Sequence, residues 1–290
     1  MTRPTFLFIG PDKAGSKWLH EILLRHPDCF VPEIADPYFF DRHYDRGLEW
    51  YLRLFHTAPA SAKAIGELSH DYLFSTPAAD RIRKDLPDVQ LLTCLRDPAE
   101  RTFSQYLSMI RAGQTRETFE QALDHIPRLI DNSRYTTHLE RYLSRFPRAQ
   151  LHILWYDQLA ADPRAFASAV FNTLGVRFIS DLPYDERVNP AGTLRNYYLS
   201  RAIQTGVSLV RALGLPQVVG VAKRSFLRSV VYRPYAPGER PRLSAATRQR
   251  IVDQLEPEMV RLERLLTVDL SPWRRGESLW TAGTRPNAQG

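Results

Sequence analysis

Short apolar runs alternate along the chain with segments whose apolar residues recur at helical spacing. Four runs are apolar along most of their length, which is typical of strands buried on both faces of a parallel sheet, and they lie at residues 5–9, 64–67, 89–95 and 151–155. Helical spacing predicts helices at about residues 16–25, 47–55, 100–110, 133–146 and 244–266. The alternation predicts an α/β fold in which helices flank a central parallel sheet.

The chain of 290 residues contains no internal repeat and no linker long enough to divide it, so we expect a single α/β domain over residues 1–274. Residues 275–290, rich in Gly, Arg, Thr and Pro, are expected to form a flexible tail. The content of 43% hydrophobic and 24% charged residues is typical of a globular protein. The first apolar run is too short for a signal peptide or a membrane span, so we expect a cytoplasmic protein without stable membrane insertion.

The net charge of +7 suits an anionic ligand. The arginines are spread along the chain rather than gathered into a run or an aromatic-interleaved patch, so we expect no nucleic-acid partner. Cys29 and Cys94 do not make a disulfide framework, and no Cys/His cluster has the spacing of metal ligands. We therefore expect no metal.

The segment FLFIGPDKAGSKWLHEIL, residues 6–23, places a glycine-bounded loop between a predicted strand and a predicted helix. This arrangement points backbone N–H groups and a helix dipole at an anion, and Lys13 can place positive charge beside a leaving phosphate oxygen. A nucleoside triphosphate loop would continue Gly-Lys-Ser or Gly-Lys-Thr, whereas the order here is Gly15-Ser16-Lys17. A glycine turn that caps a helix, with its lysines in solvent, fits the segment about equally well.

A second candidate anion site lies in LLTCLRDPAERTFSQY, residues 91–106. A buried strand delivers Arg96 to its carboxyl end, and the helix opened by Asp97 and Pro98 places Ser104 two turns along. A guanidinium and a hydroxyl can converge there on one anion. Alternatively, Arg96 forms a structural ion pair with Asp97 or Glu100. Two such loops at the ends of parallel strands predict a nucleotide with phosphates at both ends of its ribose.

These motifs resemble those of the sulfotransferases that use 3′-phosphoadenosine-5′-phosphosulfate (PAPS), nearer the carbohydrate and bacterial branch than the cytosolic aryl branch. The family's Lys-x-Gly-Thr-Thr loop, which grips the 5′-phosphosulfate, is matched here except that Lys17 replaces the second threonine. The family's 3′-phosphate motif, an arginine and a serine eight positions apart within Arg-x-Pro-x-x-Arg, is matched closely. The resemblance implies a P-loop-like fold and a cofactor site that contains Lys13, Ala14, Gly15, Ser16, Lys17, Trp18, Arg96 and Ser104.

Two further stretches resemble the family more loosely. DPYFFDRHYDRGLEWYLRLF is similar to its Lys-Glu-Pro-His-Phe-Phe segment, with Ala35 and Asp36 where Lys-Glu is usual. IGELSHDYLF is similar to Gly-Glu-Lys-Ser-Pro-x-Tyr, with Leu68 and His70 in place of lysine and proline. The resemblance implies that Glu67 is the catalytic base, and His70 is the competing candidate. The missing lysines favour a small or neutral acceptor over a sulfated polysaccharide.

The segment YAPGERPRLS, residues 235–244, lies where the family places a loop that covers the adenine and the 3′-phosphate of the cofactor. The resemblance implies a tight turn at Gly238 and a phosphate contact from Arg240. A flexible surface turn suits the same residues at least as well.

The resemblance therefore implies an enzyme that moves a sulfuryl group from PAPS to a hydroxyl of a small-molecule or carbohydrate acceptor, without a metal. Lys13 would act on the leaving phosphate, while Glu67 or His70 takes the acceptor's proton. The rivals are a P-loop small-molecule kinase with Asp157 as its magnesium ligand and a non-catalytic nucleotide-binding protein of the same fold. The sequence does not determine the oligomeric state, for which a homodimer is one option.

Overall fold

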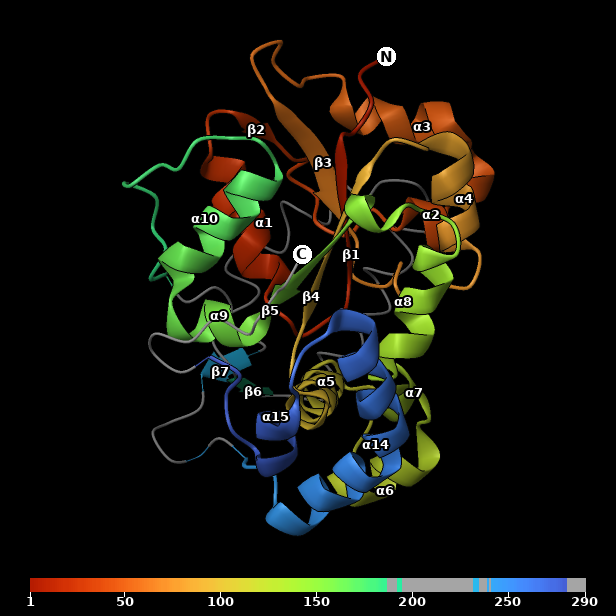
Figure 1. Ribbon diagram of the computed structural model, residues 1–290, viewed down its shortest axis with the longest axis vertical. Helices are drawn as coiled ribbons and strands as arrows, with labels where there is room; N and C mark the ends of the chain where they lie inside the picture. The colour runs from red at the N-terminus through yellow and green to blue at the C-terminus, as the bar shows by residue number, and fades with distance from the viewer. Residues whose placement is uncertain (187–191, 195–231, 235–238, 240, 281–290) are drawn as a thin grey trace.

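A five-stranded parallel sheet in the order β2-β3-β1-β4-β5 forms the centre of the molecule (Figure 1). The computed structural model describes residues 1–186, 192–194, 232–234, 239 and 241–280. The strands of the sheet are β1 (Phe6–Gly10), β2 (Cys29–Phe30), β3 (Ala64–Leu68), β4 (Gln90–Leu95) and β5 (Leu151–Trp155). A separate antiparallel pair joins β6 (Gly192–Leu194) to β7 (Tyr232–Pro234).

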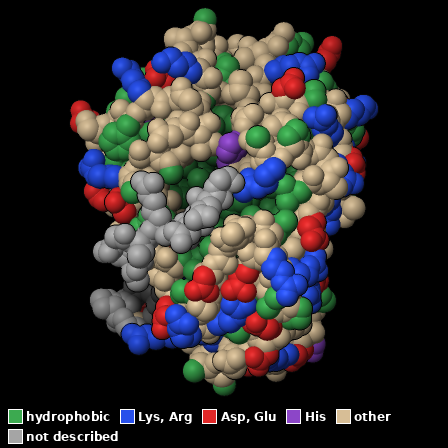
Figure 2. Space-filling view, in the orientation of Figure 1, with side chains coloured by type: hydrophobic (Ala, Val, Ile, Leu, Met, Phe, Trp, Pro, Cys, Tyr) green, Lys and Arg blue, Asp and Glu red, His purple; other side chains and the backbone are tan. Residues whose placement is uncertain are grey.

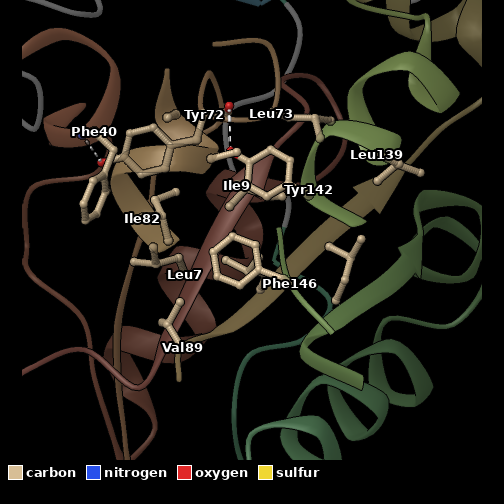
Figure 3. Packing of buried hydrophobic residues seen from close by; sticks show 14 of the residues in the cluster. Leu7, Ile9, Phe40, Tyr72, Leu73, Ile82, Val89, Leu139, Tyr142 and Phe146 are labelled. Atoms are coloured by element: carbon tan, nitrogen blue, oxygen red, sulfur yellow. Dashed lines mark hydrogen bonds between the residues drawn. The ribbon is translucent and has the colours of Figure 1, made fainter. Parts of the chain in front are cut away.

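Side chains of β1 alternate between two hydrophobic clusters, one on each face of the sheet. Phe6 and Phe8 pack in a cluster that includes residues of α1 (Ser16–Arg25), α9 (Tyr156–Ala161) and α10 (Pro163–Thr173). Leu7 and Ile9 pack in the other cluster (Figure 3), which contains residues of α2 (Phe39–Arg42), α3 (Leu48–Leu52), η2 (Arg53–Phe55), α4 (Ala78–Asp85) and α8 (Tyr135–Leu143). Burial on both faces explains why β1 reads as a continuous apolar run.

A third hydrophobic cluster lies in the lower part of Figure 1, away from the sheet. It joins α5 (Pro98–Arg111), α6 (Phe119–His125), α7 (Arg128–Asp131) and the long α14 (Ala245–Leu266). The remaining short elements are η1 (Tyr44–Arg46), η3 (Arg148–Gln150) and α15 (Ser271–Arg275). No helix in the part of the chain that the structure describes is both long and apolar enough to cross a membrane.

The structure confirms the predicted fold class, and each predicted strand agrees with an observed one to within a residue at either end. The predicted helix at 16–25 is α1, and α14 follows Ser244, whose side chain accepts a hydrogen bond from the N–H of Thr247. The segment 47–55 divides into α3 and η2, and 133–146 contains the shorter α8. β2 was not predicted, because two residues are too few to carry a period.

The C-terminal tail was expected to begin at residue 275, but packing extends further. Trp273 is completely buried and Leu279 is 9% exposed. The backbone N–H of Leu279 and the indole N–H of Trp273 both donate to the carboxylate of Asp157, at 3.0 and 3.2 Å. These contacts fasten the chain as far as residue 279 beside the end of β5, while residues 281–290 lie outside the described part.

Candidate active site

The segments that follow β3, β1 and β4 lie together at the carboxyl edge of the sheet, where α/β folds place their ligand sites. The N–H of Ser69, just past β3, donates to the carbonyl of Phe8 at 3.0 Å. On the other side of β1, Thr93 Oγ1 in β4 donates to the carbonyl of Gly10 at 2.7 Å. These hydrogen bonds hold the exits of the three strands side by side.

The first predicted loop, residues 10–15, has the strand–loop–helix geometry expected of an anion-binding loop. Gly10 has φ 121°, and a Cβ there would lie 2.1 Å from the carbonyl oxygen of His70. Gly15 has φ 90°, and its Cβ would lie 2.4 Å from Leu159 Cδ2. Only glycine tolerates both the backbone angle and the crowding. Because α1 begins at Ser16, the N–H groups that open the helix, for which a helix provides no acceptor one turn earlier, lie at the end of this loop.

Lys13 is not a solvated lysine. Its Nζ donates to Ser108 Oγ at 2.9 Å, and burial lowers its pKa, while neighbouring Asp12 acts in the opposite direction. Ser108 was not predicted as a site residue. It follows Ser104 by one helical turn on α5, so the two hydroxyls share a face.

Arg96 joins the two predicted anion loops directly. Its Nη1 donates to the carbonyl of Lys13 at 2.9 Å, and its guanidinium lies 4.4 Å from the centre of the Tyr156 ring. The alternative ion pair with Glu100 is present as well, at 3.6 Å. Ser104 follows Glu100 by one turn, so it lies on α5 between the contact to Arg96 and the contact to Lys13.

A buried arginine that the sequence analysis did not single out supports the first loop from below. Arg101 is completely buried, and its Nη1 donates to Asp12 Oδ1 at 2.9 Å. The same guanidinium reaches Ser133 Oγ at 2.7 Å and the carbonyl of Leu129 at 2.7 Å. Arg101, which is part of α5, therefore connects the loop at residues 10–15 to α7 and to the segment that follows α7. Its place in the Arg-x-Pro-x-x-Arg motif was the available signal.

The other predicted cofactor residues differ in what they expose. Ala14 and Trp18 are buried in the hydrophobic cluster on the α1 face, and the indole N–H of Trp18 donates to the carbonyl of Tyr184 at 3.0 Å. Only the backbone groups of these two residues can face a ligand. Ser16 is half-buried and Lys17 is exposed. Gly238 and Arg240 lie outside the described residues.

Glu67 ends β3 inside the protein rather than at its surface. Glu67 is 1% exposed. Its Oε1 accepts a hydrogen bond from the Tyr51 hydroxyl at 3.4 Å, whereas its Oε2 has no hydrogen bond of ordinary geometry among the described residues. Burial raises its pKa to about 8, against a lowering by the hydroxyls of Tyr72 and Ser69. At neutral pH the carboxyl is therefore mostly protonated and shielded from an acceptor, which counts against its predicted role as base.

His70 is held among acidic groups. Its Nδ1 lies 2.5 Å from Asp36 Oδ1, and its Nε2 lies 3.1 Å from Tyr38 Oη and 3.6 Å from Asp71 Oδ1. Burial lowers the pKa of the imidazole, but Asp36 and Asp71 raise it more, to about 9. A histidine that is already charged at neutral pH is poorly suited to accept a proton, so the geometry also counts against His70 as base.

Asp36 is the carboxylate that the sequence analysis missed as a candidate base. Its side chain is 13% exposed, it pairs with His70, and it lies near enough to Lys13 to act on the pKa of that lysine. The signal was the replacement of the family's glutamate in the Lys-Glu-Pro segment by another carboxylate.

The contacts of Asp157 count against the role that the kinase alternative needs. Both of its carboxylate oxygens accept hydrogen bonds from the C-terminal segment, so they already serve to hold that segment in place. Among the residues described, no three His, Cys, Asp or Glu side chains are arranged to hold a metal ion.

The face of the molecule that is turned toward the viewer in Figure 2 is hollowed near its centre. Hydrophobic side chains form the floor of the hollow, and a histidine lies at its rim.

Residues 3–191, about two thirds of the chain, match the model of the family described as "Sulfotransferase domain". The chain belongs to this sulfotransferase family. It is 32% identical over 188 residues to human heparan sulfate glucosamine 3-O-sulfotransferase 3B1. The match covers 61% of this chain and 48% of the relative. Human bifunctional heparan sulfate N-deacetylase/N-sulfotransferase 3 is 30% identical over 197 residues, covering 60% of this chain and 22% of the relative.

This chain therefore spans about half the length of the first of these curated relatives and less than a quarter of the second. Among solved structures, a sulfotransferase from Alicyclobacillus acidocaldarius has a TM-score of 0.69 and 22% identity, and the match covers 95% of this chain and 100% of that one. The likeness extends the shared fold beyond residues 3–191, and the fold is the P-loop-like α/β fold predicted from the sequence.

Proposed function

We propose that this protein transfers a sulfuryl group from PAPS to a hydroxyl of a small-molecule or carbohydrate acceptor. The observation that carries the proposal is the hydrogen bond from Arg96 to the carbonyl of Lys13, which joins the two candidate anion loops. Family membership supports the reaction. The names of the heparan sulfate relatives support a carbohydrate hydroxyl as one class of acceptor.

The residues present fit a nucleotide with a phosphate at each end. The N–H groups that open α1, with Ser16 and Lys13, would hold the 5′-phosphosulfate, and Arg96 with Ser104 would hold the 3′-phosphate. Burial disfavours the charged form of Lys13, and an anion beside it offsets that cost. PAPS supplies the sulfuryl group when bound, already joined to a phosphate that can leave.

We assign proton transfer to Asp36, because the Glu67 carboxyl is buried and mostly protonated and the His70 ring is already charged, and neither state suits a general base. Asp36 accepts the proton that the acceptor hydroxyl loses as its oxygen bonds to sulfur. Lys13 supplies positive charge to the phosphate oxygen that receives the electron pair of the broken sulfur–oxygen bond. Glu67 and His70 remain the bases predicted from the sequence, and single substitutions decide among the three.

The surroundings of Asp36 favour a small or uncharged acceptor. Positions 35 and 68 carry Ala35 and Leu68 instead of lysines, and the acidic Asp36 and Asp71 flank the same corner. An acceptor rich in sulfates would find neither of these two lysines to pair with. The cytoplasmic location and the homodimer stay predictions.

Thermal unfolding with 3′-phosphoadenosine-5′-phosphate (PAP), compared with ATP and magnesium, tests the cofactor site. A ligand at about 100 times its dissociation constant stabilises the folded state by about 2.7 kcal/mol, so we expect a clear rise in Tm with PAP. Arg96→Ala should abolish the rise. Arg164→Ala is the matched control, since Arg164 also donates to a backbone carbonyl and lies over a tyrosine ring, but away from the site.

Stabilisation by magnesium-ATP alone would contradict the proposal and support the kinase alternative. An equal rise in Tm with PAP in wild type and in Arg96→Ala would show that Arg96 does not bind PAP. With PAP binding established, an acceptor screen with PAPS separates an active sulfotransferase from a nucleotide-binding protein that has lost catalysis.

A further inference from the structure

His70 occupies a position where its ring cannot turn without breaking two contacts. Asp36 Oδ1 lies 2.5 Å from Nδ1 and Tyr38 Oη lies 3.1 Å from Nε2, so each ring nitrogen has an oxygen partner. The ring also packs edge-on against Tyr38, with 5.5 Å between the ring centres. A ring with an acceptor at each nitrogen is best satisfied when both nitrogens carry hydrogen.

The segment that carries Asp36 is fastened to the end of β3. The N–H of Asp36 donates to the carbonyl of Leu68 at 3.0 Å, and the N–H of Tyr38 donates to Ser69 Oγ at 3.1 Å. Asp36 and Tyr38 both have left-handed backbone angles, with φ of 61° and 52°. Such angles are costly for residues other than glycine and persist where surrounding contacts impose them. The His70–Asp36 geometry is thus imposed on both sides.

Charged groups from several elements face the imidazole. Asp36 and Tyr38 come from the loop before α2, Asp71 follows His70, and Asp12 belongs to the loop after β1. Arg42 of α2 pairs with Asp71 and lies 3.9 Å from the centre of the Tyr38 ring. The acids outweigh burial, so the pKa of His70 is about 9 and the ring is charged at neutral pH.

We propose that His70 is a positioning residue for catalysis, whose charged ring pairs with Asp36 and holds its carboxylate in the orientation in which it takes the proton of the acceptor. The inference rests on the proposed function, in which Asp36 is the base. His70 itself takes no proton in the reaction. Above the pH at which the ring loses its charge, the hydrogen bond to Asp36 is no longer assisted by that charge, and turnover falls.

The pH dependence of kcat, measured with saturating PAPS and an acceptor found by the screen, tests this role. Wild type should lose activity on an alkaline limb near pH 9. His70→Asn keeps an amide hydrogen near the place of Nδ1, so we expect kcat to drop about 10-fold, while His70→Ala drops it further, consistent with the loss of a hydrogen bond to a charged group. Both variants should lack the alkaline limb, and the KM for PAPS should change little.

His125→Asn is the matched control, because His125 also pairs through Nδ1 with a carboxylate, Glu117 at 2.8 Å, but on the surface. It should leave both kcat and the limb unchanged. An alkaline limb that persists in the His70 variants would overturn the proposal and leave a structural role. A rise of activity through pH 9 in wild type would overturn it in favour of His70 as base.

Two measurements keep the test decisive. If the variants fail to fold, the ¹⁵N signals of His70 in the wild-type protein still report its charge, and titration near pH 6.5 rather than 9 would overturn the inference. Asp36→Asn and Glu67→Gln test the proposed function separately. Full activity in Asp36→Asn means that the base was wrongly assigned, whereas loss of activity there with an unchanged limb in His70→Asn refutes the positioning role alone.

Discussion

Glu67 illustrates how burial changes the chemistry of a single residue. The carboxyl lies at the end of β3 with 1% exposure, and burial is the largest cause that raises its pKa to about 8. In an unfolded chain the pKa of glutamate is near 4.3. The folded state therefore binds the proton more tightly, and this contribution to stability is present below about pH 4.5 and is lost as pH rises through 8.

Glu67→Gln should consequently be more stable than wild type at alkaline pH. We expect the difference in unfolding free energy between the two proteins to grow by at most about 1.4 kcal/mol per pH unit between pH 5 and 8, and then to level off. Urea denaturation at pH 5, 7 and 9 measures it. The surface substitution Glu49→Gln controls for the chemical change. A difference independent of pH would show that Glu67 is ionised in the folded protein.

At the scale of an element, the start of α1 depends on a residue without a side chain. Gly15 has a left-handed backbone and lies directly before the helix, where a Cβ would meet Leu159 of α9. Because Gly15 has no side chain, the loop packs closely against Leu159, and its backbone stays open to the close approach of a ligand. This contact couples the anion loop to the cluster that buries α9 and α10.

Gly15→Ala should cost more than backbone strain alone. The left-handed angle accounts for about 1–2 kcal/mol, and the 2.4 Å approach to Leu159 Cδ2 adds to it. Gly175→Ala is the control, since Gly175 has φ 67° with no atom within 4 Å of its Cβ. We expect Gly15→Ala alone to weaken PAP binding by calorimetry. If Gly15→Ala and Gly175→Ala lose the same unfolding free energy and PAP binding is unchanged, Gly15 is not part of the ligand site.

At the scale of the whole molecule, the C-terminal segment closes the structure over the end of β5. Trp273 of α15 packs against Trp155 with 5.6 Å between ring centres, and Asp157 accepts from both Trp273 and Leu279. Arg248 of α14 donates to the carbonyl of Trp273 at 2.7 Å and pairs with Asp97, the cap of α5. The last helices thus support the segment that carries Arg96.

Asp157→Ala should destabilise the protein without changing PAP affinity. Two buried donors lose their acceptor, and each costs about 1–3 kcal/mol, so a loss of about 2–6 kcal/mol is expected in urea denaturation. Asp181→Ala is the control, because Asp181 is exposed and accepts from neighbouring Ser180. Loss of PAP binding in Asp157→Ala, with little change in stability, would instead place Asp157 in the ligand site.

Local pattern determined much of this protein. Apolar runs located four of the strands, and the glycines between the first strand and the first helix located the loop before α1, because these signals depend on a few neighbouring residues. Arg96 and Ser104 were predicted as a pair because the end of a strand and the spacing along the helix that follows it are both set locally. These features belong to single segments, so the sequence was sufficient to predict them.

The tertiary structure alone decided how the candidate bases differ. Glu67 and His70 are three residues apart, yet the first is mostly neutral and the second is charged at neutral pH. Burial, with the nearby Asp36 and Asp41, raises the pKa of Glu67, whereas Asp36 and Asp71 outweigh burial and raise the pKa of His70. Asp157 looked free in the sequence, but a segment more than a hundred residues later covers both of its oxygens. Burial and charge depend on residues distant in the chain, and local pattern does not encode which of them will meet.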